Sequence, residues 1–148
     1  MKNNDINESL DAALPGDSSP HDLPSGELVM RTLAMPCDTN ANGDIFGGWV
    51  LSQMDLGGAI LAKVYSPSGR AVTVAIESMA FINPIKVGGV VSTYAKVIKF
   101  GNTSMKIEVE TWVYDNYTLE LKKVTKGVFT YVAIDDHGKP IGIKNINS

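Results

Sequence analysis

Residues 46–64 have the sequence FGGWVLSQMDLGGAILAKV, in which apolar side chains recur at a spacing typical of an α-helix. Large apolar residues point in every direction around the 3.6-residue turn, so the pattern predicts a helix buried on nearly every side. Asp55 is the only carboxylate in this segment. The sequence therefore predicts a central helix that carries one acidic side chain.

Asp55 needs a physical reason to occupy such a helix. Taking an ionised carboxylate out of water without a partner costs several kcal/mol, on the order of the whole stability of a domain. Catalysis is one such reason. The structural alternative is that Asp55 lies at a solvated gap and hydrogen-bonds Ser52, its neighbour three residues earlier. The residues alone leave both interpretations open.

The rest of the chain predicts an antiparallel sheet. In residues 104–114, apolar side chains at every second position predict a dry face, while Lys106, Glu108 and Glu110 predict a wet one. Turn-forming residues separate the last three predicted strands and indicate a meander. One long helix and about five strands give an α+β fold in which the sheet must curl around the helix. The predicted strands are 28–35, 71–82, 90–100, 104–114 and 118–134.

Length and composition limit the organisation of the chain. With 148 residues and 44% hydrophobic content there is room for one core, so residues 26–148 are predicted to form a single domain. Residues 1–25 are rich in Pro, Asp, Asn, Ser and Gly, and we expect a disordered N-terminal tail there. One basic and five acidic residues give that tail a net charge of -4, so residues 26–148 carry +1 of the total of -3. The remainder lacks the basic field that nucleic-acid binding requires.

Cysteine and histidine are scarce. Cys37, His21 and His137 are too few for an ordinary zinc site, and Cys37 has no predicted base nearby, so we expect no metal, no cofactor and no cysteine nucleophile. The first residues lack the pattern of a secretory signal, and no apolar run approaches the roughly 18 to 20 residues of a membrane span. The expectation is a soluble, cytoplasmic protein that binds no membrane.

The start of the helix offers a second chemical feature. Gly47 and Gly48 stand where amide N–H groups have no intrahelical partner and the helix dipole is positive, so a ligand oxygen could bind there; the alternative is that they only allow close packing. Asp44 is expected to cap these amides. Asp55 follows Gly47 by about 12 Å along the axis, so the two meet at one carbonyl only if two copies pair with antiparallel helices.

Three segments carry a resemblance to a known family. RTLAMPCDTNANGDIFGGWVLSQMDLGGAILAK at 31–63, VTVAIESMAFINPIKVGG at 72–89 and GVFTYVAID at 127–135 resemble the YciA-type acyl-CoA thioesterases of the hotdog superfamily. The resemblance covers roughly residues 27–136. It implies a hotdog fold, in which a curled antiparallel sheet wraps a long helix, and a homodimer that assembles further into a hexamer, as a trimer of dimers.

The resemblance also implies roles for individual residues. Asp55 matches the catalytic carboxylate, Gly47 the oxyanion amide, and Asn40 a polar residue that orients the attack, although an asparagine there could simply shape the turn. The coenzyme A cradle maps to a turn and a hairpin, where Gly89 and Asn102 depart from the family's usual VGD and GR. The implied cradle residues are Gly48, Gly88, Gly89, Gly101, Asn102, Thr103, Ser104 and Lys106.

The implied reaction is hydrolysis of acyl-CoA to a free acid and CoA. Asp55 either takes a proton from water or attacks the carbonyl to give a mixed anhydride, and the sequence leaves this choice open. A thiol leaving group with a pKa of roughly 8 to 9 requires no strong general acid. Hotdog dehydratases and hydratases use a histidine that the predicted core lacks. The alternative function is a non-catalytic protein that binds or senses acyl-CoA.

Overall fold

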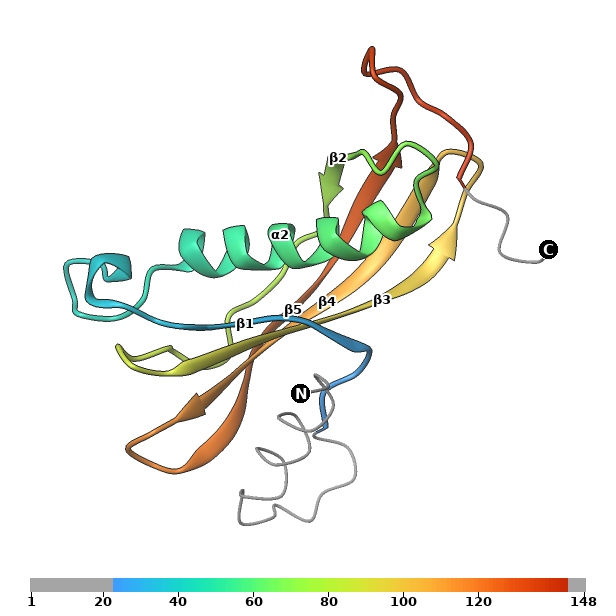
Figure 1. Cartoon of the computed structure of the whole chain (residues 1–148). Helices are drawn as coiled ribbons and strands as arrows, with labels where there is room; N and C mark the ends of the chain where they lie inside the picture. The colour runs from blue at the N-terminus through green and yellow to red at the C-terminus, as the bar shows by residue number, and fades with distance from the viewer. Residues whose placement is uncertain (1–22, 144–148) are drawn as a thin grey trace, which may run out of the picture.

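Five antiparallel strands and one long helix make up the computed structural model, which describes residues 23–143. The strands form a single sheet in the order β1–β3–β4–β5–β2. Helix α2 lies across one face of the twisted sheet and contacts all five strands (Figure 1). The predicted α+β architecture is confirmed. The elements are β1 (Glu27–Leu33), the 3₁₀ turn η1 (Pro36–Asp38), α2 (Gly47–Tyr65), β2 (Ala71–Ile76), β3 (Val90–Phe100), β4 (Ser104–Asp115) and β5 (Glu120–Ala133).

The meander of β3, β4 and β5 forms as predicted, and β3 has the predicted bounds. β2 is shorter than predicted because regular pairing ends at Ile76. Beyond it the chain still follows β5 through single hydrogen bonds, from the Glu77 amide to the Val128 carbonyl at 3.0 Å and from the Ile82 amide to the Val124 carbonyl at 2.7 Å.

Two glycines let α2 approach the sheet closely. A Cβ atom on Gly57 would lie 2.7 Å from the Thr93 methyl group and 2.9 Å from a Val29 methyl group. On Gly58 it would lie 2.3 Å from the Tyr131 hydroxyl oxygen. Larger residues at these positions would push the helix off the sheet, since protein cores hold few voids that could absorb the extra atoms.

The helix is not buried on every side, so that prediction is wrong for a single chain. Val50, Met54 and Leu61 face the core. Leu56 and Ile60 face outward, with exposed fractions of 56% and 47%. The apolar pattern of α2 therefore includes both the core face and an outer face that residues 23–143 leave exposed.

The predicted wet face of β4 is also wrong at one position. The Glu110 side chain is buried and accepts hydrogen bonds from the Trp112 indole and the Ser25 amide, both at 3.0 Å, while the Lys123 amine lies 3.4 Å away. Burial alone would raise the pKa of Glu110, but these donors outweigh it and hold the pKa below its ordinary value of 4.5. The carboxylate thus anchors the segment that leads into β1.

Most of the predicted disordered tail, residues 1–22, lies outside the described residues. Of its last three residues, which are described, Ser25 is held by Glu110 and accepts a hydrogen bond from the Lys96 amine at 2.7 Å. No helix within residues 23–143 is long and apolar enough to cross a membrane.

Replacing Glu110 by glutamine should lower the free energy of unfolding at pH 7 by about 1 kcal/mol, because the charged acceptor is lost. The folded-state pKa is depressed, so the wild-type contribution is present above pH 4.5 and is lost as the pH falls. The deficit of Glu110→Gln should therefore shrink in urea titrations taken from pH 7 down to pH 3. Glu120→Gln, at an exposed position, is the control. A deficit that stays constant with pH would contradict this account.

Candidate active site

The Asp55 carboxylate is held by hydroxyl groups from two strands. Asp55 is half-buried on α2, where its side chain faces β2 and β5. Thr73 donates a hydrogen bond to Oδ1 at 2.6 Å, and the Tyr131 hydroxyl lies 3.0 Å from the same oxygen. The Ser52 hydroxyl bonds the Trp49 carbonyl at 2.7 Å instead, so the predicted hydrogen bond between Ser52 and Asp55 is wrong.

The carboxylate has no cationic partner within the described part of the chain. Both recorded side-chain donors, Thr73 and Tyr131, meet Oδ1, and among residues 23–143 no donor meets Oδ2. A half-buried carboxylate that keeps one oxygen unbonded has the geometry of a base or nucleophile.

Tyr131 stays a hydrogen-bond donor over the usable pH range. Burial raises the pKa of its hydroxyl above the ordinary value of 10, and the nearby negative charge of Asp55 raises it further. The donor to Asp55 is therefore a neutral phenol, not a phenolate.

The first turn of α2 presents free amides. Phe46, in an extended conformation, precedes the helix and supplies no side-chain cap, and the Gly47 N–H has no recorded acceptor among the described residues. Gly47 and Gly48 are both exposed. A Cβ on Gly47 would make only an ordinary contact, 3.5 Å from the Phe81 ring. Close packing therefore does not require glycine at this position.

Asp44 does not cap the helix, so that prediction is wrong. Its carboxylate pairs with the amine of Lys86, which lies far away in the sequence on the segment before β3. This pair joins the loop before α2 to that segment, and the backbone bond from the Ile45 amide to the Ile85 carbonyl, 3.1 Å, joins the same two regions.

Asn40 shapes the loop before α2. Its side-chain oxygen accepts hydrogen bonds from the amides of Asn42 at 2.9 Å and Asp44 at 3.2 Å, and its own amide bonds the Asp44 carbonyl at 2.7 Å. The residue is exposed near the start of the helix. Within one chain it belongs to the Gly47 end of α2.

The predicted coenzyme A cradle divides between the two ends of β3. Gly88 and Gly89 precede this 11-residue strand and Gly101 follows it, so the length of the strand, about 36 Å at about 3.3 Å per residue, lies between them. The Tyr65 and Phe100 rings, 5.1 Å apart, place the second half beside the C-terminal end of α2. One chain therefore does not bring the cradle residues together.

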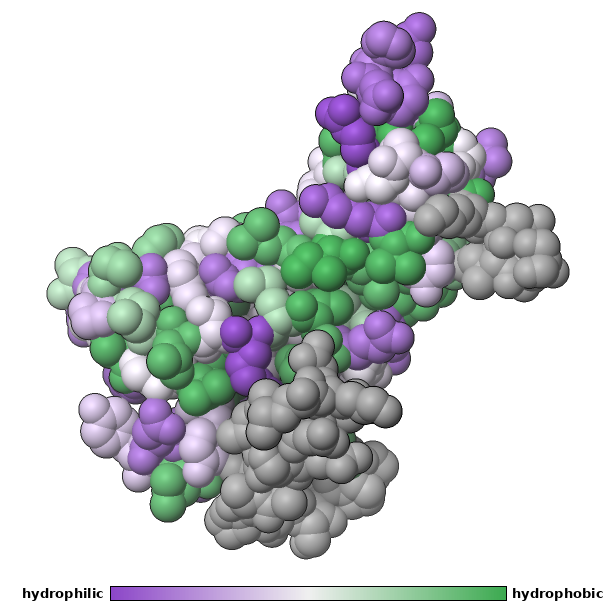
Figure 2. Space-filling model, viewed as in Figure 1, coloured by the Kyte–Doolittle hydropathy of each residue, from purple (hydrophilic) through white to green (hydrophobic). Residues whose placement is uncertain are grey.

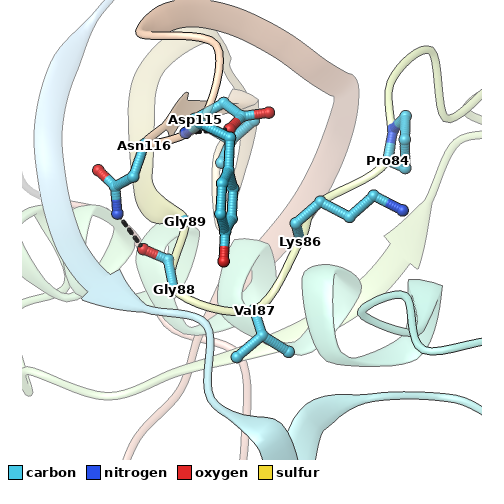
Figure 3. A pocket seen from close by; sticks show the side chains of 9 residues that line it. Pro84, Lys86, Val87, Gly88, Gly89, Asp115 and Asn116 are labelled. Atoms are coloured by element: carbon cyan, nitrogen blue, oxygen red, sulfur yellow. Dashed lines mark hydrogen bonds between the residues drawn. The ribbon is translucent and has the colours of Figure 1, made fainter.

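The first half of the cradle borders a pocket (Figure 3). Gly88 and Gly89 line it together with Lys86, Asp115 and Asn116. The Asn116 side-chain amide donates to the Gly88 carbonyl at 2.7 Å, which ties the turn after β4 to the turn before β3.

The second half forms the β3–β4 hairpin and binds the C-terminal segment. The carbonyl of Asn102 accepts from the Ile143 amide at 3.1 Å, and that of Thr103 from the Ala133 amide at 2.9 Å. The Gly101 amide bonds the Ser104 carbonyl at 2.7 Å. The other predicted cradle residue, Lys106, lies 3.5 Å from the Glu77 carboxylate, with both side chains largely exposed.

Sequence reasoning missed Thr73 and Tyr131. Both stand in predicted strands, where a β-branched residue such as Thr73 and an aromatic residue such as Tyr131 are common. The available signal was the hydroxyl, which in a core strand needs a partner. The identity of that partner, Asp55, depends on the tertiary fold.

Comparisons with known proteins identify the family of the chain. The model of the thioesterase superfamily matches residues 42–120. The acyl-CoA thioester hydrolase YciA of Escherichia coli is 53% identical over 126 residues, which cover 83% of this chain and 95% of that protein. A hexameric broad-specificity acyl-coenzyme A thioesterase superposes with a TM-score of 0.79 at 55% identity, covering 84% of this chain and 86% of the other. A hexameric hotdog fold thioesterase of Campylobacter jejuni gives 0.75 at 42%, covering 80% and 91%.

The central helix, the curled sheet and these matches define a hotdog-fold thioesterase. Within that superfamily the chain belongs to the YciA acyl-CoA thioester hydrolases. The predicted family, fold and enzyme class are thereby confirmed.

Replacing Asp44 by asparagine should change the free energy of unfolding by at most about 1 kcal/mol, because its ion pair with Lys86 is largely exposed to solvent. If Asp44 were a helix cap, its negative charge would also interact favourably with the helix dipole, and removing that charge would lower the free energy of unfolding further. Thermal melting at low and high salt tests this, and a large destabilisation that persists in high salt would favour the capping role.

Proposed function

We propose that Asp55 carries out the hydrolysis of the acyl-CoA thioester together with the Gly47 amide of a second copy of the chain. The observation that carries the proposal is the state of Asp55: it is half-buried and held at Oδ1 by two hydroxyl groups, while no donor among residues 23–143 meets Oδ2. The broad-specificity thioesterase has also been solved as a variant in which one aspartate is replaced by alanine.

The distance between the two groups supports a shared site. Gly47 and Asp55 lie on one unbroken helix, and eight residues separate them by about 12 Å. A base and an oxyanion donor must both lie near one carbonyl, within about 3 Å of the reacting atoms. Two antiparallel copies of α2 placed side by side meet that requirement.

The surface of the chain supports the same pairing. β2 is an edge strand with β5 on one side only, and its side chains Val72, Val74 and Ile76 are exposed. Figure 2 shows apolar side chains gathered on the face of the molecule on which α2 lies. Leu56 and Ile60 of α2 are exposed as well. An exposed apolar edge strand is a template for pairing with another chain. A second copy paired through β2 would cover this surface, and the two solved thioesterases named above are hexameric.

The chemistry follows from these positions. The Gly47 amide polarises the thioester carbonyl, and either Asp55 takes a proton from the attacking water or Oδ2 attacks the acyl carbon and water opens the resulting anhydride. In both routes the acyl C–S bond breaks, an acyl C–O bond forms and a proton reaches the CoA sulfur. Asn40, which lies on the loop before Gly47, orients the attack.

The two halves of the cradle fit this assembly better than a single chain. The end with Gly88 and Gly89 lies on the side of the helix start, because Asp44 pairs with Lys86 there. The hairpin Gly101–Ser104 lies at the other end of α2. Antiparallel helices would place the Gly88–Gly89 turn of one copy near the Gly101–Ser104 hairpin of the other. CoA would then bind between subunits.

Replacing Asp55 by asparagine should lower kcat by about 10²–10⁴-fold, the usual contribution of a general base, because an amide neither accepts the proton nor attacks. Free thiol release from acyl-CoAs of graded chain length measures this, with Asp44→Asn as the matched carboxylate control. If Asp55→Asn is as fast as the wild type, the role of Asp55 is wrong. If the wild type releases no thiol at any chain length, a binding or sensing function is favoured.

Replacing Gly47 by proline removes the proposed oxyanion donor with little change of backbone. Proline is favoured at the first helical position, and Phe46 before it is extended at φ −75° and ψ 148°, as proline requires. The loss of one such donor should cost about 10²–10³-fold in kcat. Gly47→Ala, which keeps the N–H, is the control.

Co-expression of Gly47→Pro with Asp55→Asn tests the shared site. A mixed dimer has one site with both groups intact, so random pairing should restore about a quarter of the wild-type activity from two nearly inactive variants. If each site used both groups of one chain, mixing would restore nothing.

A further inference from the structure

We propose that Tyr131 is a positioning residue for the reaction, and that its hydroxyl holds Asp55 Oδ1 so that Oδ2 faces the thioester. The inference rests on the proposed role of Asp55 and adds to it which carboxylate oxygen reacts and which core residue fixes it. The hydroxyl lies 3.0 Å from Oδ1 and 3.0 Å from the Asp55 carbonyl oxygen, so its single proton is shared between two oxygens of one residue.

Packing alone does not explain a tyrosine here. Phe129, two residues earlier on the same face of β5, is also fully buried, and its ring is nearly parallel to that of Tyr131 at 6.4 Å. Phenylalanine thus satisfies the core at the neighbouring position. Burying an extra hydroxyl costs free energy unless it is hydrogen-bonded, so the oxygen at 131 needs partners. It donates to Asp55, and the Thr73 hydroxyl also interacts with it.

The helix is shaped to admit this hydroxyl. A Cβ atom on Gly58 would lie 2.3 Å from the Tyr131 oxygen and 2.9 Å from the ring carbon that bears it. Gly58 stands three residues after Asp55, on the turn that follows it. The absence of a side chain at 58 therefore leaves the space in which the Tyr131 hydroxyl reaches Asp55 on α2.

The two donors restrict the carboxylate from different sides. Thr73 approaches Oδ1 from the edge strand β2, and Tyr131 approaches it from the neighbouring strand β5. The bond of Tyr131 to the Asp55 carbonyl also ties the hydroxyl to the helix backbone. With Oδ1 fixed, rotation of the carboxylate is restrained and Oδ2 has one direction. Correct orientation of a reacting group raises the reaction rate strongly and changes the affinity for the substrate little.

The test compares Tyr131→Phe with the wild type in kcat, KM, thermal stability and oligomeric state of the full chain. Phenylalanine keeps the ring packing and removes only the hydroxyl. We expect kcat to fall about tenfold, the usual effect of one hydrogen bond to a charged group, while KM changes less than about twofold. Tyr114→Phe, which removes a hydroxyl from a half-buried tyrosine on β4 far from Asp55 in the sheet register, should change neither.

Two results overturn the inference. An unchanged kcat for Tyr131→Phe means that the hydroxyl does not position the reacting oxygen. A raised KM with unchanged kcat means that Tyr131 acts on substrate binding instead. Asp55→Asn measured alongside separates this from the proposed function: if Asp55→Asn loses activity and Tyr131→Phe does not, only the role of Tyr131 is wrong, and if Asp55→Asn keeps wild-type kcat, the role of Asp55 is wrong as well.

Gly58→Ala gives a second measurement that does not change the tyrosine. The added methyl group should displace the hydroxyl from Asp55 and lower kcat on its own. Because both substitutions break the same contact, their effects on kcat should be less than multiplicative when combined. Fully multiplicative effects would mean that the methyl group and the hydroxyl act independently, which contradicts the inference.

Discussion

The close contact between α2 and the sheet at Gly57 and Gly58 is the constraint on which the rest of the structure depends. Thr93 and Val29 occupy the space where a Gly57 side chain would be, and the Tyr131 hydroxyl occupies that of Gly58. The helix therefore lies close enough for Asp55 to meet hydroxyl groups that belong to strands. A methyl group at position 57 or 58 would hold the helix further from the sheet. The fold class would stay the same, but Asp55 would lose its hydrogen bonds to these hydroxyl groups.

In the proposed dimer, one chain supplies half of each reacting arrangement. The core face of α2 is filled by residues such as Met54 and Leu61, while Leu56 and Ile60 on the opposite face stay exposed among the described residues 23–143. A helix with two apolar faces can pack against two partners, which in the proposed dimer are its own sheet and a second copy. The same proposal accounts for the eight residues between Gly47 and Asp55 on one helix, since two chains can combine these groups where one chain cannot.

The sequence predicted the helix and the meander because those depend on local periodicity. It singled out Asp55 because this is the one acidic side chain in an otherwise apolar helix. It failed where distant residues meet. Asp44 looks like a helix cap until the fold places Lys86 beside it. Glu110 alternates like a solvent-facing residue, yet Trp112 and Ser25 cover it. Periodicity also gives the same signal for a face buried by the sheet and a face exposed in one chain, which is why the helix was expected to be wrapped all round.

β2 connects assembly with the reacting group in the proposed dimer. Thr73 stands on this short edge strand, which has β5 on one side and exposed apolar residues along its length. An edge strand gains hydrogen bonds when another strand pairs with it, and its side chains then lose mobility. Tyr131, in contrast, comes from a strand bonded on both sides. One donor to Asp55 is thus fixed by the core of the chain itself, and the other becomes fixed when the partner that supplies the Gly47 amide binds.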